Sequence, residues 1–137
     1  MEEKIKPIKF IHLALVLGVS AAYFFLGELN NLEFLDFGDW DSVSYAVLTL
    51  PIAVVFGMNI VYKNILKSAD KSLSLEQKLG PYMTANIVRW ALLEGVSMVL
   101  LILRPEMMLI GILCIMYMAY LFPSVDRMKQ DFEMLDF

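Results

Sequence analysis

Two opposite charges lie inside one apolar stretch of the chain, residues 82–103. Arg89 and Glu94 are the only full charges in the interior of any of the four apolar stretches of this sequence. An ionisable group in lipid is costly, so it usually marks a partner contact, a water-filled pocket or a proton path. These two side chains are therefore the first candidates for function.

The rotation of a helix separates these two charges. Successive residues are about 100° apart, so Arg89 and Glu94 point about 140° apart and do not pair well within one helix. Further polar or amphipathic side chains point between them and complete one polar arc: Tyr82, Asn86, Trp90 and Ser97.

The polar arc supports two interpretations. In the first, Asn86, Arg89, Glu94 and Ser97 join helices through hydrogen bonds of about 0.6–2 kcal/mol each. In the second, Glu94 near the midplane is a proton or ligand site. It would then be protonated, hydrated in a cavity or paired through another subunit, and we predict the protonated form at neutral pH. Arg89 leans toward the N-terminus of its helix, where inner headgroups or loop carboxylates can meet it.

One histidine and one cysteine limit the remaining chemistry. His12, near the inner end of the first apolar stretch, could join a proton relay because imidazole titrates near neutral pH, although a simple interface anchor is the plainer interpretation. Cys114 has no second cysteine to pair with, and a multi-ligand Cys/His metal site cannot be assembled. Nucleotide-binding and zinc-protease motifs are absent from the sequence. We therefore expect no enzymatic activity, no metal, no cofactor and no nucleic-acid partner.

The composition indicates the elements that must position these residues. The chain has 137 residues, of which 59% are hydrophobic, against about 45–50% in soluble domains. The excess is concentrated in blocks of about twenty residues, each long enough to cross a hydrocarbon core of ~30 Å. This predicts an all-α integral membrane bundle of four transmembrane helices in domain 1–123, followed by a cytoplasmic amphipathic tail, 124–137. The expected spans are 8–27, 43–65, 82–103 and 106–122.

The third span is the least suited to lipid. Its ten Leu, Ile and Val residues favour insertion by roughly 3–6 kcal/mol, and its Arg and Glu each oppose it by about 2.5–3.5 kcal/mol. These contributions nearly cancel. The third span should therefore be the one most surrounded by protein.

Basic residues predict the orientation, because cytoplasmic loops carry an excess of Lys and Arg. Nine basic residues fall on one side of the expected membrane, whereas the other side has only Arg104. We expect a multi-pass protein of the bacterial inner membrane with both termini in the cytoplasm. The nine residues are Lys4, Lys6, Lys9, Lys63, Lys67, Lys71, Lys78, Arg127 and Lys129.

Local signals predict where helices begin and bend. Asp41 or Ser42 can cap the second span, and Pro51 should kink it. The segment 74–77 can form a capping box and a short surface helix, after which Gly80-Pro81 should start the third span. Ser124 can cap a final helix whose apolar face is formed by Val125, Met128, Phe132 and Leu135.

Two further patterns concern surfaces. The outer loop 28–42 is acidic and aromatic, which is typical of a solvated loop at the headgroup layer, or of a docking surface. Small residues recur every four positions at 14, 18 and 22 and at 49, 53 and 57, and this spacing favours close helix approach.

Three segments carry a family resemblance: residues 11–15 (Ile-His-Leu-Ala-Leu), residues 82–95 with Arg-Trp-Ala-Leu-Leu-Glu-Gly at their end, and residues 122–127 (Phe-Pro-Ser-Val-Asp-Arg). In these the chain resembles small uncharacterised four-span membrane proteins common in Bacteroidetes-type bacteria. The resemblance implies a fold and a membrane location, and no activity.

Two functional hypotheses follow. The first is a non-enzymatic scaffold or accessory subunit that associates through the third span or the tail. The alternative is a small oligomer that conducts protons or a solute by means of Glu94. In both cases the expected partners are the lipid bilayer and either further copies of the chain or a larger membrane complex.

Overall fold

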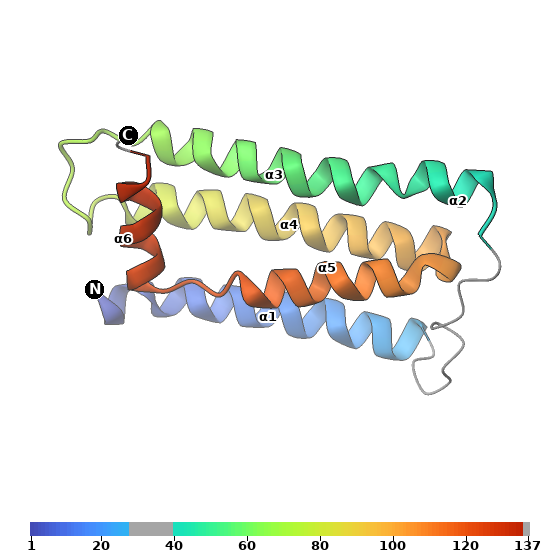
Figure 1. The fold of residues 1–137 in the computed structure, drawn as a ribbon. Helices are drawn as coiled ribbons and strands as arrows, with labels where there is room; N and C mark the ends of the chain where they lie inside the picture. Colours follow the sequence, from blue (N-terminus) through green and yellow to red (C-terminus); the bar gives the residue numbers. More distant parts are fainter. Residues whose placement is uncertain (28–39, 136–137) are drawn as a thin grey trace.

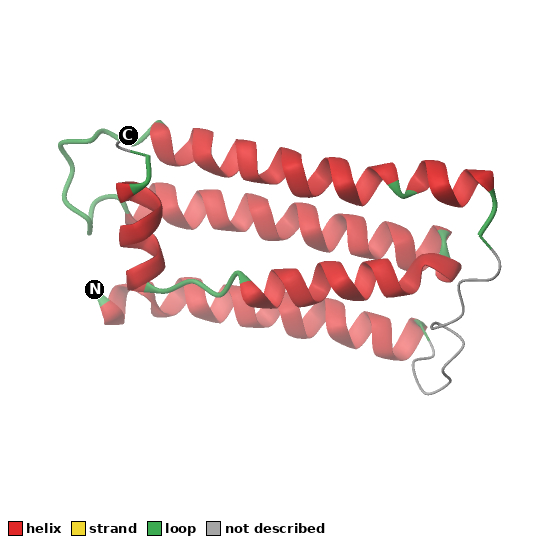
Figure 2. Ribbon diagram, in the orientation of Figure 1, coloured by secondary structure: helices red, strands yellow, loops and turns green. Residues whose placement is uncertain are grey.

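The computed structural model describes residues 1–27 and 40–135, and this part of the chain is helical throughout, without a β-strand. The all-α class predicted from the sequence is therefore confirmed (Figure 2). The elements are α1 (Glu2–Leu26), α2 (Ser42–Val47), α3 (Thr49–Lys67), α4 (Leu79–Leu103), the 3-10 turn η2 (Pro105–Met107), α5 (Met108–Tyr120) and α6 (Val125–Glu133).

The long helices run side by side along one axis, and α6 lies across one end of them (Figure 1). Both termini lie at this end (Figure 1). Helix α4 is the central element, because it packs against α3, α5 and α1. In the most apolar window of α4, 44% of residues are buried, against 22% for α1 and 17% for the α2–α3 segment. The expectation that the third apolar stretch is the most enclosed by protein is thus confirmed.

Three segments are long and apolar enough to cross a membrane: Glu2–Leu26, Ser42–Lys67 and Leu79–Leu103. The segment Pro105–Tyr120 qualifies only together with α6, from which it is bent by 93°, so length and composition support three or four spans. Helix α1 begins at Glu2 instead of at position 8. Its first turn is acidic, which suits the positive end of the helix dipole, and Lys6 reaches back to Glu3 at 2.7 Å.

The second apolar segment is interrupted near its N-terminal end. Helix α2 ends at Val47 and α3 begins at Thr49, with Leu48 between them. Pro51 has no N–H to donate to the carbonyl of Val47, so the regular bonding pattern fails at the position expected from the sequence. The Thr49 hydroxyl compensates in part, donating to the carbonyl of Ala46 at 2.6 Å.

Two predicted helix caps are present. A carboxylate oxygen of Asp41 accepts the backbone N–H of Ser44 at 2.8 Å, and Ser124 Oγ accepts the N–H of Arg127 at 3.1 Å. The hydrogen bonds from Ser44 also hold the pKa of Asp41 below its ordinary value.

The capping box at residues 74–77 also forms, but it does not start a surface helix. The Ser74 N–H donates to Gln77 Oε1 at 2.9 Å, and the Gln77 N–H donates to Ser74 Oγ at 3.3 Å. Residues 75–78 nevertheless form a turn that leads straight into α4. Helix α4 then starts at Leu79, before Gly80-Pro81, since proline is tolerated in a first helical turn.

Most of the outer loop lies outside the described residues. The acidic and aromatic residues expected there at 28–39 are therefore untested, and only its last part is placed. Trp40 Nε1 donates to the carbonyl of Glu106 at 3.1 Å, and Ser44 Oγ donates to Glu106 Oε1 at 3.1 Å. These bonds connect the start of α2 to the turn between α4 and α5.

The amphipathic tail is part of the hydrophobic core. The buried residues of α6 are Val125, Met128 and Phe132, as the helical spacing predicted, and Met128 is fully buried. They pack in the same cluster as Trp90 and Leu93 of α4. The chain therefore covers the apolar face of α6 with its own helices.

Candidate functional site

The polar side chains of α4 divide into two groups. Asn86, Arg89, Trp90 and Ser97 are buried, and the most exposed of them, Arg89, keeps only 8% of its surface accessible. Glu94 is half-buried at the edge of the face that α4 leaves exposed. The single polar arc read from the sequence is therefore an enclosed set of groups with one carboxyl outside it.

Arg89 is held without a carboxylate. Its Nη2 donates to Asn86 Oδ1 at 2.7 Å, and Asn86 Nδ2 in turn donates to the carbonyl of Tyr82 at 2.9 Å. The guanidinium lies over the ring of Tyr62, 3.8 Å from its centroid. Among the described residues Arg89 Nε has no hydrogen-bond partner. Within the described part of the chain, the direct contacts of this buried cation are thus an amide and an aromatic face.

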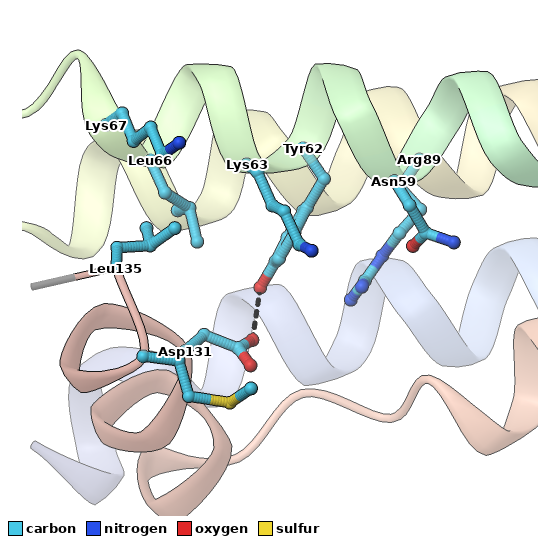
Figure 3. A pocket seen from close by; sticks show the side chains of 9 residues that line it. Asn59, Tyr62, Lys63, Leu66, Lys67, Arg89, Asp131 and Leu135 are labelled. Atoms are coloured by element: carbon cyan, nitrogen blue, oxygen red, sulfur yellow. Dashed lines mark hydrogen bonds between the residues drawn. The ribbon is translucent and has the colours of Figure 1, made fainter. Parts of the chain in front are cut away.

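A pocket of about 340 Å³ opens beside Arg89 (Figure 3). It lies between α3, α4 and the end of α6, where Tyr62 donates its hydroxyl to the Asp131 carboxylate at 2.5 Å. The pocket is lined by Asn59, Tyr62, Lys63, Leu66, Lys67, Arg89, Asp131, Met134 and Leu135. Of these residues only Arg89 was a candidate from the sequence, because the pocket is assembled from three separate segments.

His12 lies between helices and not at the edge of the bundle. It is 3% exposed, and its Nε2 donates to the carbonyl of Met118 at 2.7 Å, so the proton is on Nε2 in the neutral ring. Helix α5 ends at Tyr120, which leaves its last carbonyls without partners inside the helix, and His12 bonds one of them. The ring also contacts Trp90 and Phe122, with centroid separations of 4.7 and 5.4 Å. These contacts give His12 a structural role that the interface-anchor interpretation did not include.

Ser97 lies where α1, α4 and α5 approach one another most closely. The Tyr23 hydroxyl donates to the backbone carbonyl of Ser97, and the Ser97 hydroxyl donates to the carbonyl of Leu93 at 2.8 Å. A Cβ at Gly111 would lie 1.8 Å from the Tyr23 oxygen, so this glycine is required by the close contact. A lone glycine among the large side chains of α5 was the available sequence signal for this contact.

Glu94 differs from the other polar residues of α4. It makes no hydrogen bond or ion pair with any described residue, and it does not line the pocket beside Arg89. Its neighbours Ala91 and Gly95 are exposed, and a Cβ added at Gly95 would meet nothing within 4 Å. Of the candidates predicted from the sequence, Asn86 thus contacts Arg89, and His12 contacts Trp90. Ser97 bonds other residues, and Glu94 remains apart.

Most of the regularly spaced small residues face outward from the bundle, although Ala22 packs against the core. Ala14, Gly18 and Ala53 are exposed, and a Cβ at Gly18 would have no neighbour within 4 Å. These two stripes therefore do not form the helix contacts within the described part of the chain.

Comparison with family models, curated proteins and solved structures found no match to this chain. The structure by itself defines the class, an all-helical protein with three or four candidate membrane spans. In residues 1–27 and 40–135, no three His, Cys, Asp or Glu side chains are grouped to hold a metal ion. Function is therefore inferred from the residues of this chain alone.

Proposed function

We propose that this protein is a four-span integral membrane protein that acts as a scaffold or accessory subunit without enzymatic activity. In this proposal, the side of α4 that carries Glu94 binds a transmembrane helix of a second copy of the chain. The observation that carries this proposal concerns Glu94, which is half-buried near the middle of an apolar helix. Glu94 has no hydrogen-bond or ion-pair partner among the described residues.

The surroundings of Glu94 suit contact with another helix. Ala91 and Gly95 are exposed and four residues apart, the spacing at which small residues let two transmembrane backbones approach closely. Met98 lies partly exposed on the same side and offers an adaptable apolar contact. A carboxyl in hydrocarbon is costly, so a hydrogen bond from Glu94 to a facing copy would favour association.

Conduction through α4 has less support. Asn86 and Ser97 are at most 1% exposed and bond to carbonyls of their own helix, and Arg89 is bonded to Asn86. Asn86 and Ser97 are thus enclosed by protein, and the pocket that Arg89 lines does not include Glu94. A proton path would need them to line water together with Glu94.

Association through α4 predicts that a leucine substitution affects the oligomer at one exposed glycine and not at another. Gly95→Leu should reduce the oligomer by at least about tenfold, because a large side chain would hold the two helices apart. The control is Gly18→Leu on α1, which adds the same side chain at another exposed glycine with nothing within 4 Å. Native mass spectrometry of gently solubilised protein measures the ratio of oligomer to monomer. A monomeric wild type, or a loss of oligomer in Gly18→Leu alone, would contradict association through α4.

Replacement of the carboxyl separates the two functional hypotheses. Glu94→Gln keeps the size and hydrogen bonding of the side chain and removes its titratable proton. The scaffold proposal expects normal assembly and no change in proton flux of reconstituted liposomes. Flux in the wild type that is lost in Glu94→Gln would instead support the conducting oligomer.

The inner membrane of a bacterium is the proposed location, with the end of the bundle that carries α6 and both termini in the cytoplasm. The bias of basic residues supports this orientation. In a Cys114→Ala background, a membrane-impermeant thiol reagent added to intact cells should label a cysteine at Asn31 and not one at Ser72. Labelling only at Ser72 would reverse the orientation.

A further inference from the structure

The pocket beside Arg89 carries an excess of positive charge. Among the described residues that line it, Arg89, Lys63 and Lys67 are cationic and Asp131 is anionic, a formal excess of two positive charges. Asp131 accepts the Tyr62 hydroxyl and forms no ion pair with Arg89. The pocket therefore has cationic groups that its own carboxylate does not neutralise.

Arg89 retains donors that the fold does not use. A guanidinium has five N–H donors, and the described residues accept one of these bonds, through Asn86. Its Nε is buried without a partner. A buried charge is stable only when it is well paired and its hydrogen bonds are satisfied, so an anion in the pocket would complete the site. Figure 3 shows the Arg89 side chain on the same side of α3 and α4 as Lys63 and Asp131.

The lysines place further charge at the opening of this pocket. Lys63 and Lys67 are exposed and one helical turn apart on α3, and Asn59 lies one turn before them. A neighbouring cavity of about 230 Å³ shares Lys67 and is also lined by Lys71 and Lys78. Lys67 thus lines both cavities, next to α6.

Size and chemistry indicate the class of ligand. A volume of about 340 Å³ falls within the ~300–1,000 Å³ of small-molecule sites. Arginine binds phosphate oxygens through two parallel N–H bonds, and lysine adds a mobile point charge. Basic pockets between transmembrane helices on the cytoplasmic side suit anionic lipid headgroups.

We propose that this pocket binds a phosphate-bearing anion. Arg89 forms the buried end of the site, and Lys63 and Lys67 hold the anion at its mouth. The phosphate belongs to an anionic phospholipid of the inner leaflet or to a free phosphate. This site lies on another side of α4 from Glu94 and does not depend on association through that residue.

The test uses native mass spectrometry of the full chain in a neutral detergent. The protein is titrated in separate arms with phosphatidylglycerol, with phosphatidylcholine and with inorganic phosphate. The pocket variant is Lys63→Gln/Lys67→Gln. The matched control, Lys6→Gln/Lys129→Gln, removes two positive charges from exposed positions on α1 and α6 that do not line the pocket.

We expect phosphatidylglycerol to bind the wild type and the control equally, and the pocket variant to bind about tenfold more weakly. Arg89→Lys keeps the charge but loses the two-pronged donor, so it should also weaken binding, with folding checked by thermal unfolding. Binding of inorganic phosphate as tight as that of phosphatidylglycerol would identify the free anion as the ligand. Binding of phosphatidylglycerol without binding of inorganic phosphate would identify the lipid. Equal binding of phosphatidylglycerol by pocket variant and control, or binding of neither anion by the wild type, would overturn the proposal.

Discussion

Gly111→Ala should destabilise the protein by about 1–5 kcal/mol, although alanine is the better helix former. The added Cβ would lie 1.8 Å from the Tyr23 oxygen and 2.7 Å from Cζ of the same ring. Overpacking of this kind typically costs about 1–3 kcal/mol. Moving the ring away would also break its hydrogen bond to the buried carbonyl of Ser97, a further ~1–3 kcal/mol. The gain in helix propensity, about 1 kcal/mol, is smaller than either cost.

Two comparisons test this explanation by chemical unfolding in detergent. Gly18→Ala adds the same atom where nothing lies within 4 Å, so it should leave the free energy of unfolding unchanged or raised. In the Gly111→Ala background, Tyr23→Phe removes the nearest clashing atom and should recover part of the loss. A Gly111→Ala protein as stable as Gly18→Ala would show that α1 and α5 are not this close.

Trp90→Ala is expected to be the most damaging truncation, at about 3–5 kcal/mol. Trp90 is fully buried and packs edge-on against His12, which also bonds the end of α5. Its loss would leave a cavity where α4, α1 and α5 meet. Trp90→Phe should cost less, because the indole N–H has no partner among the described residues and its removal leaves no donor unsatisfied.

The control for Trp90→Ala is an aromatic residue on the outside of the same bundle. Phe25 of α1 is 77% exposed, so Phe25→Ala should change the free energy of unfolding far less than Trp90→Ala. Thermal unfolding of the two variants side by side measures the difference. Equal losses would mean that Trp90 is not enclosed as described.

Local sequence signals predicted the helices well, because they depend on neighbouring residues. The caps at Asp41 and Ser124 and the interruption before Pro51 all follow from backbone hydrogen bonding over a few positions. The apolar spacing of the tail likewise predicted the buried face of α6. The fourth predicted span was harder to predict from the sequence, since α5 is short and a bend of 93° separates it from α6.

The contacts that form the candidate site could not be predicted in this way. Tyr62 and Asp131 are 69 positions apart, and His12 and Met118 are 106 apart, so no periodic pattern relates them. The sequence did single out Arg89, yet it assigned the arginine to headgroups or loop carboxylates, whereas the structure gives it Asn86 and the ring of Tyr62. Pairing between distant segments depends on how the helices pack.

Cross-linking within the membrane tests the central claim, association through the Glu94 side of α4, most directly. In a Cys114→Ala background, a cysteine replaces either Ala91 on α4 or Leu17 on α1, and both positions are exposed. Oxidation of isolated membranes should join two copies through position 91 and leave the position 17 protein without a cross-link. Glu94→Leu combined with the cysteine at 91 should reduce that product, because the carboxyl can no longer bond the facing helix. No dimer through position 91, or the same yield from position 17, would contradict association through this side of α4.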